Sequence, residues 1–433
     1  MTIRLSDPLD LPCGITLPNR ICKAAMTEGL ADAQLRATEK HARLYKRWAE
    51  GGIGLSLTGN VQIDRRHLER PGNVAIDGNG GLEALKAYAA AGTTGGVELW
   101  MQINHPGRQE PASISPNPRA PSDVQLGSND KAFGKPIPLT GEEIEDIIAR
   151  FIHVSETAKA TGFTGMQMHS AHGYLSSEFL SPVVNRRTDQ WGGSLENRAR
   201  FLLNIVRGVR EACGRDFGIS VKLNSSDFQQ GAFTLEECQQ VVSWLGEAGI
   251  DLLEISGGTY EQPMMVGNKG NAKTWQDPLK ETTKAREAYF VDYAKAIRPA
   301  ASMPLMVTGG FRSREVMEAA LNEGGIDVIG LARPLCGDPD SPAKLLAGEI
   351  DTLPAYENEL LVGEEDAPAL SPVQRAMLQG HGQQGWFCMK IIEMGEGNDP
   401  DLEMTCLDAA KAYDENEAAT NTRRIAALDQ QAA

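Results

Sequence analysis

Residues 219–256 read ISVKLNSSDFQQGAFTLEECQQVVSWLGEAGIDLLEIS. Two short apolar runs, 219–223 and 252–256, flank a segment at 235–248 in which apolar residues recur at helical spacing. Thr234 stands immediately before this segment and Glu237 follows three residues later, which is the spacing of a helix-capping box. The stretch therefore predicts a strand, a helix and a second strand in succession, the repeating unit of a parallel sheet.

The same unit recurs along the chain. The predicted strands are 21–26, 53–58, 97–103, 165–169, 219–223, 252–256, 305–308 and 327–331. The predicted helices are 38–50, 81–91, 141–161, 195–212, 235–248, 284–297, 313–322 and 342–347. Eight such units are the number that closes a (β/α)8 TIM barrel. A doubly wound open α/β sheet is the alternative, but no Gly-rich dinucleotide fingerprint follows any of these strands.

Three segments lie outside the repeat. Turn signals around short apolar stretches in residues 1–19 predict an N-terminal hairpin at the bottom of the barrel. Residues 104–139, rich in Pro, Ser, Asn and Gly, predict a long loop that covers a site. We therefore expect a barrel over 1–350 and a C-terminal helical extension over 351–433, with helices at 371–378, 386–393 and 405–428. A partly disordered tail after about residue 415 is the alternative.

Composition excludes several classes of protein. The 433 residues carry a formal net charge of −16, which argues against binding nucleic acid or an anionic membrane. The seven cysteines are scattered without a CxxC pair, which argues against structural zinc, a cysteine-ligated iron–sulfur cluster or a disulfide scaffold. The first residues lack the apolar core of a secretory signal, and no run approaches the ~18 apolar residues of a membrane span. A cytoplasmic protein is the expectation.

The fourth predicted strand ends in MHSAHGY at 168–174, which places His169, His172 and Tyr174 where barrel enzymes carry reactive groups. A zinc site would need a third ligand and an activating acid, and no HExxH pattern is present. A structural role at the strand end is a second interpretation. In the third, two imidazoles hold a carbonyl or nitro oxygen and the phenol delivers a proton. That arrangement suits reduction of an activated C=C bond with a hydride supplied by a cofactor.

Other strand ends suit the binding of that cofactor. Gln102 offers an amide after the third strand, and Lys222 offers a positive charge on the fifth. The seventh and eighth strands are followed by Thr308, Gly309 and Gly310 and by Ala332 and Arg333. In a barrel, these last two turns form the position that binds phosphate through backbone N–H groups. An ordinary strand-to-helix turn is the alternative for the glycine pair.

Further motifs extend the pattern. They are LPNRI at 17–21, AMT at 25–27, AEGGIG at 49–54, HPGRQ at 105–109, HSAHGYL at 169–175, FLSP at 179–182, NRRTD at 185–189 and WGGSLENR at 191–198. Over about residues 5–345 the chain resembles the Old Yellow Enzyme family of FMN-dependent NAD(P)H:flavin oxidoreductases. The resemblance implies a TIM barrel with FMN at its top and NADH or NADPH as hydride donor. It also implies ping-pong reduction of activated C=C bonds in α,β-unsaturated carbonyl or nitro compounds.

The resemblance also implies roles for single residues. His169 and His172 would hold the electron-withdrawing group of the substrate, and Tyr174 would protonate its α-carbon. The positions that match flavin contacts are Ala25, Met26, Thr27, Gly59, Gln102 and Lys222, and those that match the phosphate site are Gly309, Gly310, Ala332 and Arg333. No residue is predicted as a metal ligand. The chain departs from the family where Lys222 replaces a common Arg and Ala332 a common Gly, and it lacks the clustered cysteines of the similar dienoyl-CoA reductases.

Alternative functions remain open from the sequence alone. They are a related NADH oxidase or amine demethylase, a non-flavin barrel that binds a phosphorylated metabolite, and a catalytically silent flavin-binding scaffold. We expect a small-molecule substrate, neither nucleic acid nor membrane as partner, and a homo-oligomer formed through the C-terminal helices.

Overall fold

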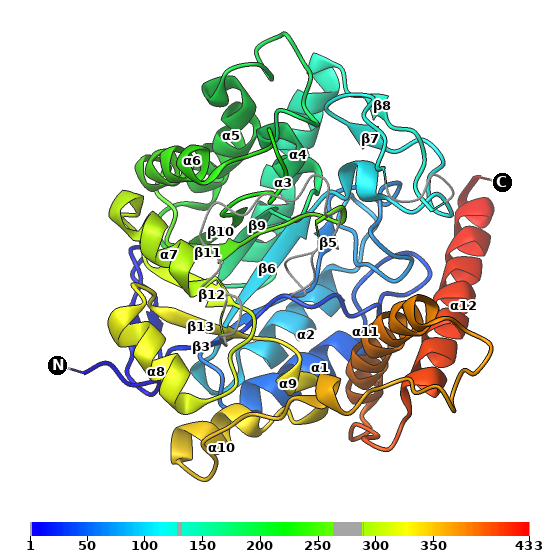
Figure 1. The fold of residues 1–433 in the computed structure, drawn as a ribbon. Coiled ribbons are helices and arrows are strands. Elements are labelled where there is room, and N and C mark those ends of the chain that lie inside the picture. Colours follow the sequence, from blue (N-terminus) through cyan, green and yellow to red (C-terminus); the bar gives the residue numbers. More distant parts are fainter. Residues whose placement is uncertain (1, 128–131, 263–287, 289, 433) are drawn as a thin grey trace.

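The structure, a computed structural model, describes residues 2–127, 132–262, 288 and 290–432. Eight parallel strands close into a barrel (Figure 1). In order around the ring they are β3 (Ile21–Lys23), β4 (Leu55–Leu57), β6 (Glu98–Asn104), β9 (Gly165–Ser170), β10 (Gly218–Asn224), β11 (Leu252–Ser256), β12 (Leu305–Thr308) and β13 (Val328–Leu331). Because β13 pairs with β3 and β4 pairs with β6, the ring is closed. The predicted (β/α)8 barrel is confirmed, and the open sheet is excluded.

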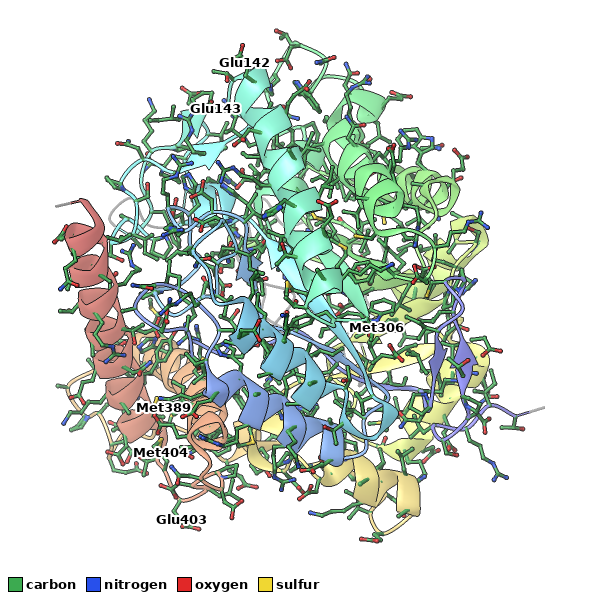
Figure 2. All side chains as sticks on the ribbon, turned by 180° about the vertical axis from the view of Figure 1, so that it is seen from behind. Glu142, Glu143, Met306, Met389, Glu403 and Met404 are labelled. Carbon is green, nitrogen blue, oxygen red and sulfur yellow. The ribbon has the colours of Figure 1, made fainter. Side chains whose placement is uncertain are left out.

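Helices cover the outside of the barrel. They are α1 (Glu39–Glu50), α2 (Leu82–Gly92), α3 (Gly141–Ala160), α5 (Leu195–Cys213), α6 (Leu235–Ala248), α7 (Val291–Ile297), α8 (Arg314–Glu323) and α10 (Ser341–Ala347). The capping boxes of α3 and α6 are both present, and Figure 2 shows Glu143 at the outer end of α3. The predicted helix 284–297 begins among residues outside the described part of the chain. Two short helices, α4 (Leu175–Leu180) and α9 (Pro334–Gly337), were not predicted.

The predicted N-terminal hairpin closes the bottom of the barrel. Its strands β1 (Leu9–Asp10) and β2 (Thr16–Leu17) pair antiparallel, and the hairpin packs into the apolar cluster that contains Trp100. The Trp100 ring fits inside the barrel because glycines face it from the next two strands. A Cβ on Gly165 would lie 2.7 Å from Trp100, and a Cβ on Gly218 would lie 2.3 Å from it. Side chains therefore fill the bottom of the barrel.

The loop predicted after the third strand contains little regular structure. Within it, the two-residue strands β7 (Arg119–Ala120) and β8 (Ile137–Pro138) pair with each other. Outside this loop, a short strand β5 (Val61–Gln62), which follows β4, pairs with β6. Among the described residues, no helix is both long and apolar enough to cross a membrane. All seven cysteines are free thiols, so no disulfide supports the fold.

The C-terminal region forms two long helices that pack against each other, α11 (Pro372–Glu396) and α12 (Cys406–Ala432) (Figure 1). The prediction of separate helices at 371–378 and 386–393 is wrong, because α11 is continuous. A Cβ on Gly382 would lie 2.3 Å from the Cys406 carbonyl oxygen, and one on Gly385 would lie 2.7 Å from that of Ala409. These glycines allow α12 to approach closely and do not end the helix. The alternative of a disordered tail is also wrong, because α12 continues past residue 415.

Candidate active site

A cavity of about 650 Å³ opens at the C-terminal ends of the strands. Its walls come from the residues that follow β3, β9, β12 and β13, from the ends of β10 and β11, and from α11 and α12. Of the predicted site residues it is lined by Ala25, Met26, Thr27, His172, Lys222, Gly309, Gly310, Ala332 and Arg333. Segments from the two ends of the barrel sequence thus meet in one hollow.

The other four predicted residues lie directly behind this lining. The side chains of Gln102, His169 and Tyr174 are buried, at 2%, 4% and 5% exposed. Gly59 packs against the backbone that carries Met26 and Thr27, where a Cβ would lie 2.6 Å from the Met26 carbonyl oxygen. The structure therefore places all four beside the cavity, with His169 and Tyr174 reaching it through neighbouring side chains.

The two histidines form part of a continuous chain of hydrogen bonds. His169 Nε2 lies 3.2 Å from His172 Nδ1, and His172 Nε2 lies 2.7 Å from Ser256 Oγ. On the other side, His169 Nδ1 lies 2.9 Å from Asn60 Oδ1, while the Asn60 amide nitrogen donates to the Glu69 carboxylate. Because a carboxylate only accepts, Asn60 presents its oxygen to His169, and His169 Nδ1 carries the proton. His169 Nε2 then accepts from His172 Nδ1–H.

The ionisation of these groups follows from their burial. Burial lowers the pKa of His169 well below its usual range, and the neighbouring His172 and Lys222 lower it further. Burial and the Lys222 charge lower the pKa of His172 in the same way. Both imidazoles are therefore neutral near pH 7, and each carries one N–H donor.

Tyr174 lies against this pair. Its ring centroid is 4.6 Å from that of His169, and its hydroxyl lies 2.8 Å from that of Tyr260, which lines the cavity. Burial raises the pKa of Tyr174 well above its usual range, so the phenol keeps its proton. Neutral donors and a protonated phenol side by side can hold a substrate oxygen and supply a proton.

Charged side chains lie at both ends of the cavity lining. Lys222 Nζ lies 3.0 Å from the buried Glu254 carboxylate inside the barrel. At the far end, Gly309 and Gly310 have φ values of 118° and 82°. Residues with a side chain rarely adopt this backbone conformation, which sets the direction of the two N–H groups. Arg333 Nη1 lies 3.4 Å from Glu357, which also pairs with Arg312. Two guanidinium groups that line this end of the cavity, those of Arg312 and Arg333, therefore both contact Glu357.

The C-terminal helices contribute a wall of the cavity, and no sequence motif marked its individual residues. The lining residues from α11 and α12 are Gly380, Gln383, Gln384, Phe387, Cys388, Ile391 and Tyr413. Arg70 fixes this wall to the barrel, because its Nη2 lies 2.5 Å from Glu417 on α12 and its Nη1 lies 3.3 Å from the Thr27 carbonyl oxygen. The glycine-interrupted pattern of α11 concealed its length, and no motif marked its inward face.

Other residues that the sequence analysis missed follow a common pattern. Asn60 and Glu69 come shortly after an apolar strand, and Glu254 and Gln167 lie within apolar strands. A single carboxylate inside the run LLEIS at 252–256 was the available signal, because an unpaired charge is not buried in a barrel interior.

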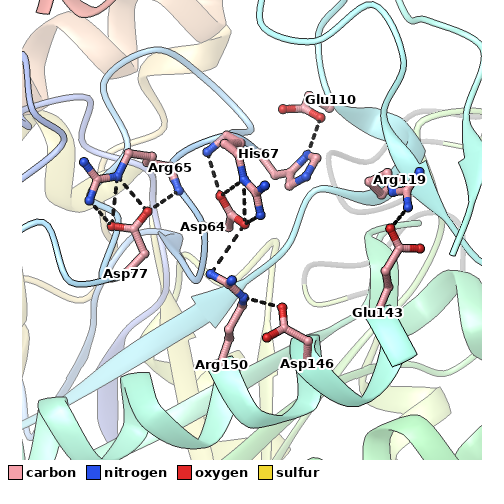
Figure 3. Close-up of polar contacts among 10 residues, drawn as sticks. Asp64, Arg65, His67, Asp77, Glu110, Arg119, Glu143, Asp146 and Arg150 are labelled. Carbon is pink, nitrogen blue, oxygen red and sulfur yellow. Dashed lines mark hydrogen bonds and ion pairs between the residues drawn. The ribbon is translucent and has the colours of Figure 1, made fainter. Parts of the chain in front are cut away.

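A second, smaller cavity of about 350 Å³ lies between the loop after β5, the loop after β6 and α3. Its arginines are all paired with carboxylates, and His67 contacts a glutamate (Figure 3). The pairs are Arg66 with Asp64, Arg150 with Asp64 and Asp146, Arg119 with Glu143, and His67 with Glu110. The network therefore holds two loops and one helix together. Within the described part of the chain, no three His, Cys, Asp or Glu side chains are grouped as metal ligands.

The buried His105 beside this cavity predicts a pH-dependent stability. Burial and His67 lower the pKa of His105 well below its usual value of 6.5. The unfolded chain therefore binds a proton below pH 6.5 that the folded chain does not, and His105 reduces the free energy of unfolding as the pH falls through this value.

We expect His105→Gln to remove this penalty. We compare the free energy of unfolding of the variant with that of the unmodified chain at about one pH unit above 6.5 and about one unit below. The difference, variant minus unmodified chain, should be larger at the lower pH by about 1 kcal/mol. Urea unfolding at both pH values measures this. The exposed His153→Gln is the matched control, and an equal difference at both pH values for His105→Gln would contradict the prediction.

Comparison with known proteins identifies the chain. The model of the NADH:flavin oxidoreductase / NADH oxidase family matches residues 4–351. The chain belongs to this family. It is the family of Old Yellow Enzyme, as the motifs predicted, and the chain is therefore an FMN-dependent oxidoreductase that uses a nicotinamide donor. Residues 352–433, with α11 and α12, lie beyond the matched region.

Relatives in the Old Yellow Enzyme family match more than three quarters of this chain. The NADH-dependent flavin oxidoreductase iliE of Hypocrea jecorina is 37% identical over 368 residues, which cover 79% of this chain and 89% of that protein. The iliE protein of Neonectria sp. is 38% identical over 360 residues, but the match spans 77% of this chain and only 46% of that longer protein. The solved Old Yellow Enzyme homologue from Zymomonas mobilis is 25% identical, with a TM-score of 0.68 over 85% of this chain and 99% of that structure.

Proposed function

We propose that the protein reduces activated C=C bonds of α,β-unsaturated carbonyl or nitro compounds. The observation that carries the proposal is the joining of His169, His172 and Tyr174 at one edge of the main cavity. Two neutral imidazoles and a protonated phenol serve a reaction in which charge develops on an oxygen and a carbon takes up a proton. Amine demethylation or reduction of oxygen needs no such proton donor.

The cavity lining fits FMN. One end is lined by Arg333 and by the backbone of Gly309 and Gly310, and a guanidinium group with backbone N–H groups suits a phosphate. Apolar side chains of Met26, Phe387 and Ile391 suit a planar ring. The proposed binding residues are Ala25, Met26, Thr27, Gly59, Gln102, Lys222, Gly309, Gly310, Ala332 and Arg333. When bound, FMN supplies the hydride transfer.

The residues of the chain would act in two ways in this reaction. His169 and His172 bind the carbonyl or nitro oxygen through N–H donors, which polarises the conjugated bond and stabilises the negative charge that forms there. Binding requires both N–H groups to leave their present partners, since the Nδ1–H of His172 is bonded to His169 and the Nδ1–H of His169 is bonded to Asn60. Tyr174 then transfers its proton to the α-carbon. Its raised pKa keeps the proton in place until the carbon has gained negative charge.

NADH or NADPH and the substrate use the cavity in turn in this proposal, so that the cycle is ping-pong. Both would have to reach the same flavin through the cavity beside His169 and His172, which supports alternate occupation. The choice between NADH and NADPH is left to experiment, because no Gly-rich dinucleotide motif is present to encode it.

Anaerobic stopped-flow absorbance of the purified, yellow protein tests the function. NADH or NADPH should bleach the flavin band, and 2-cyclohexenone should then restore it without oxygen. Recovery only when oxygen is admitted would contradict the proposal and favour an NADH oxidase. Flavin that is retained but never bleached would indicate a silent scaffold, and a colourless protein that takes up no FMN would indicate a non-flavin barrel.

The wider organisation of the protein is also proposed. We divide the chain into an FMN-binding barrel at 1–350 and a helical extension at 351–433, and we propose a cytoplasmic enzyme. A homo-oligomer through the C-terminal helices stays a prediction. It is supported by exposed apolar side chains, because five of the eight large ones among the described residues lie in this region: Leu361, Val373, Met377, Leu402 and Ile425. Light scattering measures the mass in solution.

A further inference from the structure

Polar side chains from five neighbouring strands form a hydrogen-bonded layer inside the barrel, directly below the cavity. Gln102 Nε2 donates to Gln167 Oε1 at 2.7 Å, and Gln167 Nε2 donates to Glu254 Oε2 at 2.9 Å. The Lys222 ammonium at 3.0 Å and the Thr308 hydroxyl at 2.6 Å both contact Glu254 Oε1. Lys222 and Thr308 also line the cavity, so this layer forms its floor.

Glu254 is the centre of the layer. Its side chain is 0% exposed, and both of its oxygens accept hydrogen bonds from the surrounding donors. On the neighbouring strand, Lys222 stands directly beside it in register. An ammonium paired with a carboxylate acts on a third group as a dipole, whose field is much weaker than that of an isolated charge. The attraction of Lys222 for an anionic ligand is therefore reduced by Glu254.

The carboxylate also fixes the orientation of two amides. A carboxylate only accepts, so Gln167 must turn its NH₂ group toward Glu254 and its carbonyl oxygen toward Gln102. Gln102 then has to use its own NH₂ group in that bond. Its carbonyl oxygen is left outside the chain of bonds as an acceptor for a ligand. The buried charge of Glu254 thus determines, through Gln167, that Gln102 offers its carbonyl oxygen to a ligand.

We infer that Glu254 is a positioning residue that lowers the reduction potential of the bound flavin by opposing the charge of Lys222 and orienting Gln102. The inference rests on the proposed function, in which Gln102 and Lys222 bind FMN, and it takes the pyrimidine edge of the flavin as the part that they contact. Reduction gives that edge negative charge, so whatever weakens Lys222 makes reduction harder. The alternative is that Glu254 only satisfies buried donors and leaves the potential unchanged.

The test is the midpoint potential of FMN in Glu254→Gln, measured anaerobically against a reference dye. The substitution keeps the shape and removes the charge. We expect the affinity for reduced relative to oxidised FMN to rise at least tenfold, which for a two-electron couple is a shift of about 30 mV toward positive potential. The control is Ser220→Ala, which removes the hydroxyl that accepts from Gln167 at 3.1 Å without changing any charge.

A potential in Glu254→Gln equal to that of Ser220→Ala and the unmodified protein would overturn the inference and leave the proposed function intact. Failure of the unmodified protein to bind FMN would overturn both.

Should Glu254→Gln fail to fold, we compare the midpoint potentials of Lys222→Met and of the double variant Lys222→Met/Glu254→Gln. The single variant leaves the Glu254 carboxylate without its ammonium partner, and the double variant removes that carboxylate. The double variant should then have the higher potential, and equal potentials would overturn the inference.

Discussion

Tyr174→Phe should slow the reoxidation of reduced enzyme by 2-cyclohexenone by about 100-fold or more and leave reduction by NADH unchanged. The substitution removes only the hydroxyl that is 2.8 Å from the Tyr260 hydroxyl. The half-reaction with NADH needs no proton from this side chain, whereas the half-reaction with the enone ends in protonation of a carbon. The two rates are read separately by anaerobic stopped flow.

Tyr260→Phe is the matched control for this experiment. It removes the partner hydroxyl and leaves that of Tyr174 in place, so its effect on reoxidation should be about tenfold or less. If Tyr174→Phe and Tyr260→Phe slowed reoxidation equally, the assignment of Tyr174 as the proton donor would be wrong.

His169→Ala should reduce the rate of reoxidation by an enone about 100–1,000-fold, the usual cost of losing a donor to a developing oxyanion. Its effect is enlarged by the position of His169 in the hydrogen-bonded chain. Without it, Asn60 no longer determines which nitrogen of His172 carries the proton. The affinity for a para-substituted phenol should also fall in His169→Ala. It is measured from the change that phenol binding causes in the flavin absorbance spectrum.

His172→Asn is the informative comparison for the second histidine. His172 has a φ of 65°, a left-handed backbone that asparagine adopts more readily than most residues. An asparagine amide also retains an N–H donor, so this variant should keep the rate within about tenfold of the original. A loss as large as that of His169→Ala would show that the imidazole ring itself is required at this position.

The barrel and the clustered residues of the site could be predicted from sequence because both depend on local patterns. Each strand is a short apolar run, and the run MHSAHGY at 168–174 follows one of them. Because all strand ends of a parallel barrel meet at one face, the predicted residues had to converge there. Gly309 and Arg333 were placed together by the same argument.

The missed features depend on contacts between distant parts of the chain. The inward face of α11 acquires its meaning only when the helix lies over the cavity, and Gly382 and Gly385 break the sequence pattern while serving the packing of α12. The pairing of Arg70 with Glu417 joins residues that are 347 positions apart. Glu254 was visible as a charge in an apolar run, but its partners come from three other strands.

The wall formed by α11 and α12 has a consequence for the biosynthesis of the protein. Ribosomes deliver the chain from its N-terminus, so the barrel emerges before these two helices. Until Glu417 pairs with Arg70, the nascent barrel lacks the wall that α11 and α12 form. The cavity is then more open to a large, charged cofactor. Docking of the helices afterwards confines what has entered.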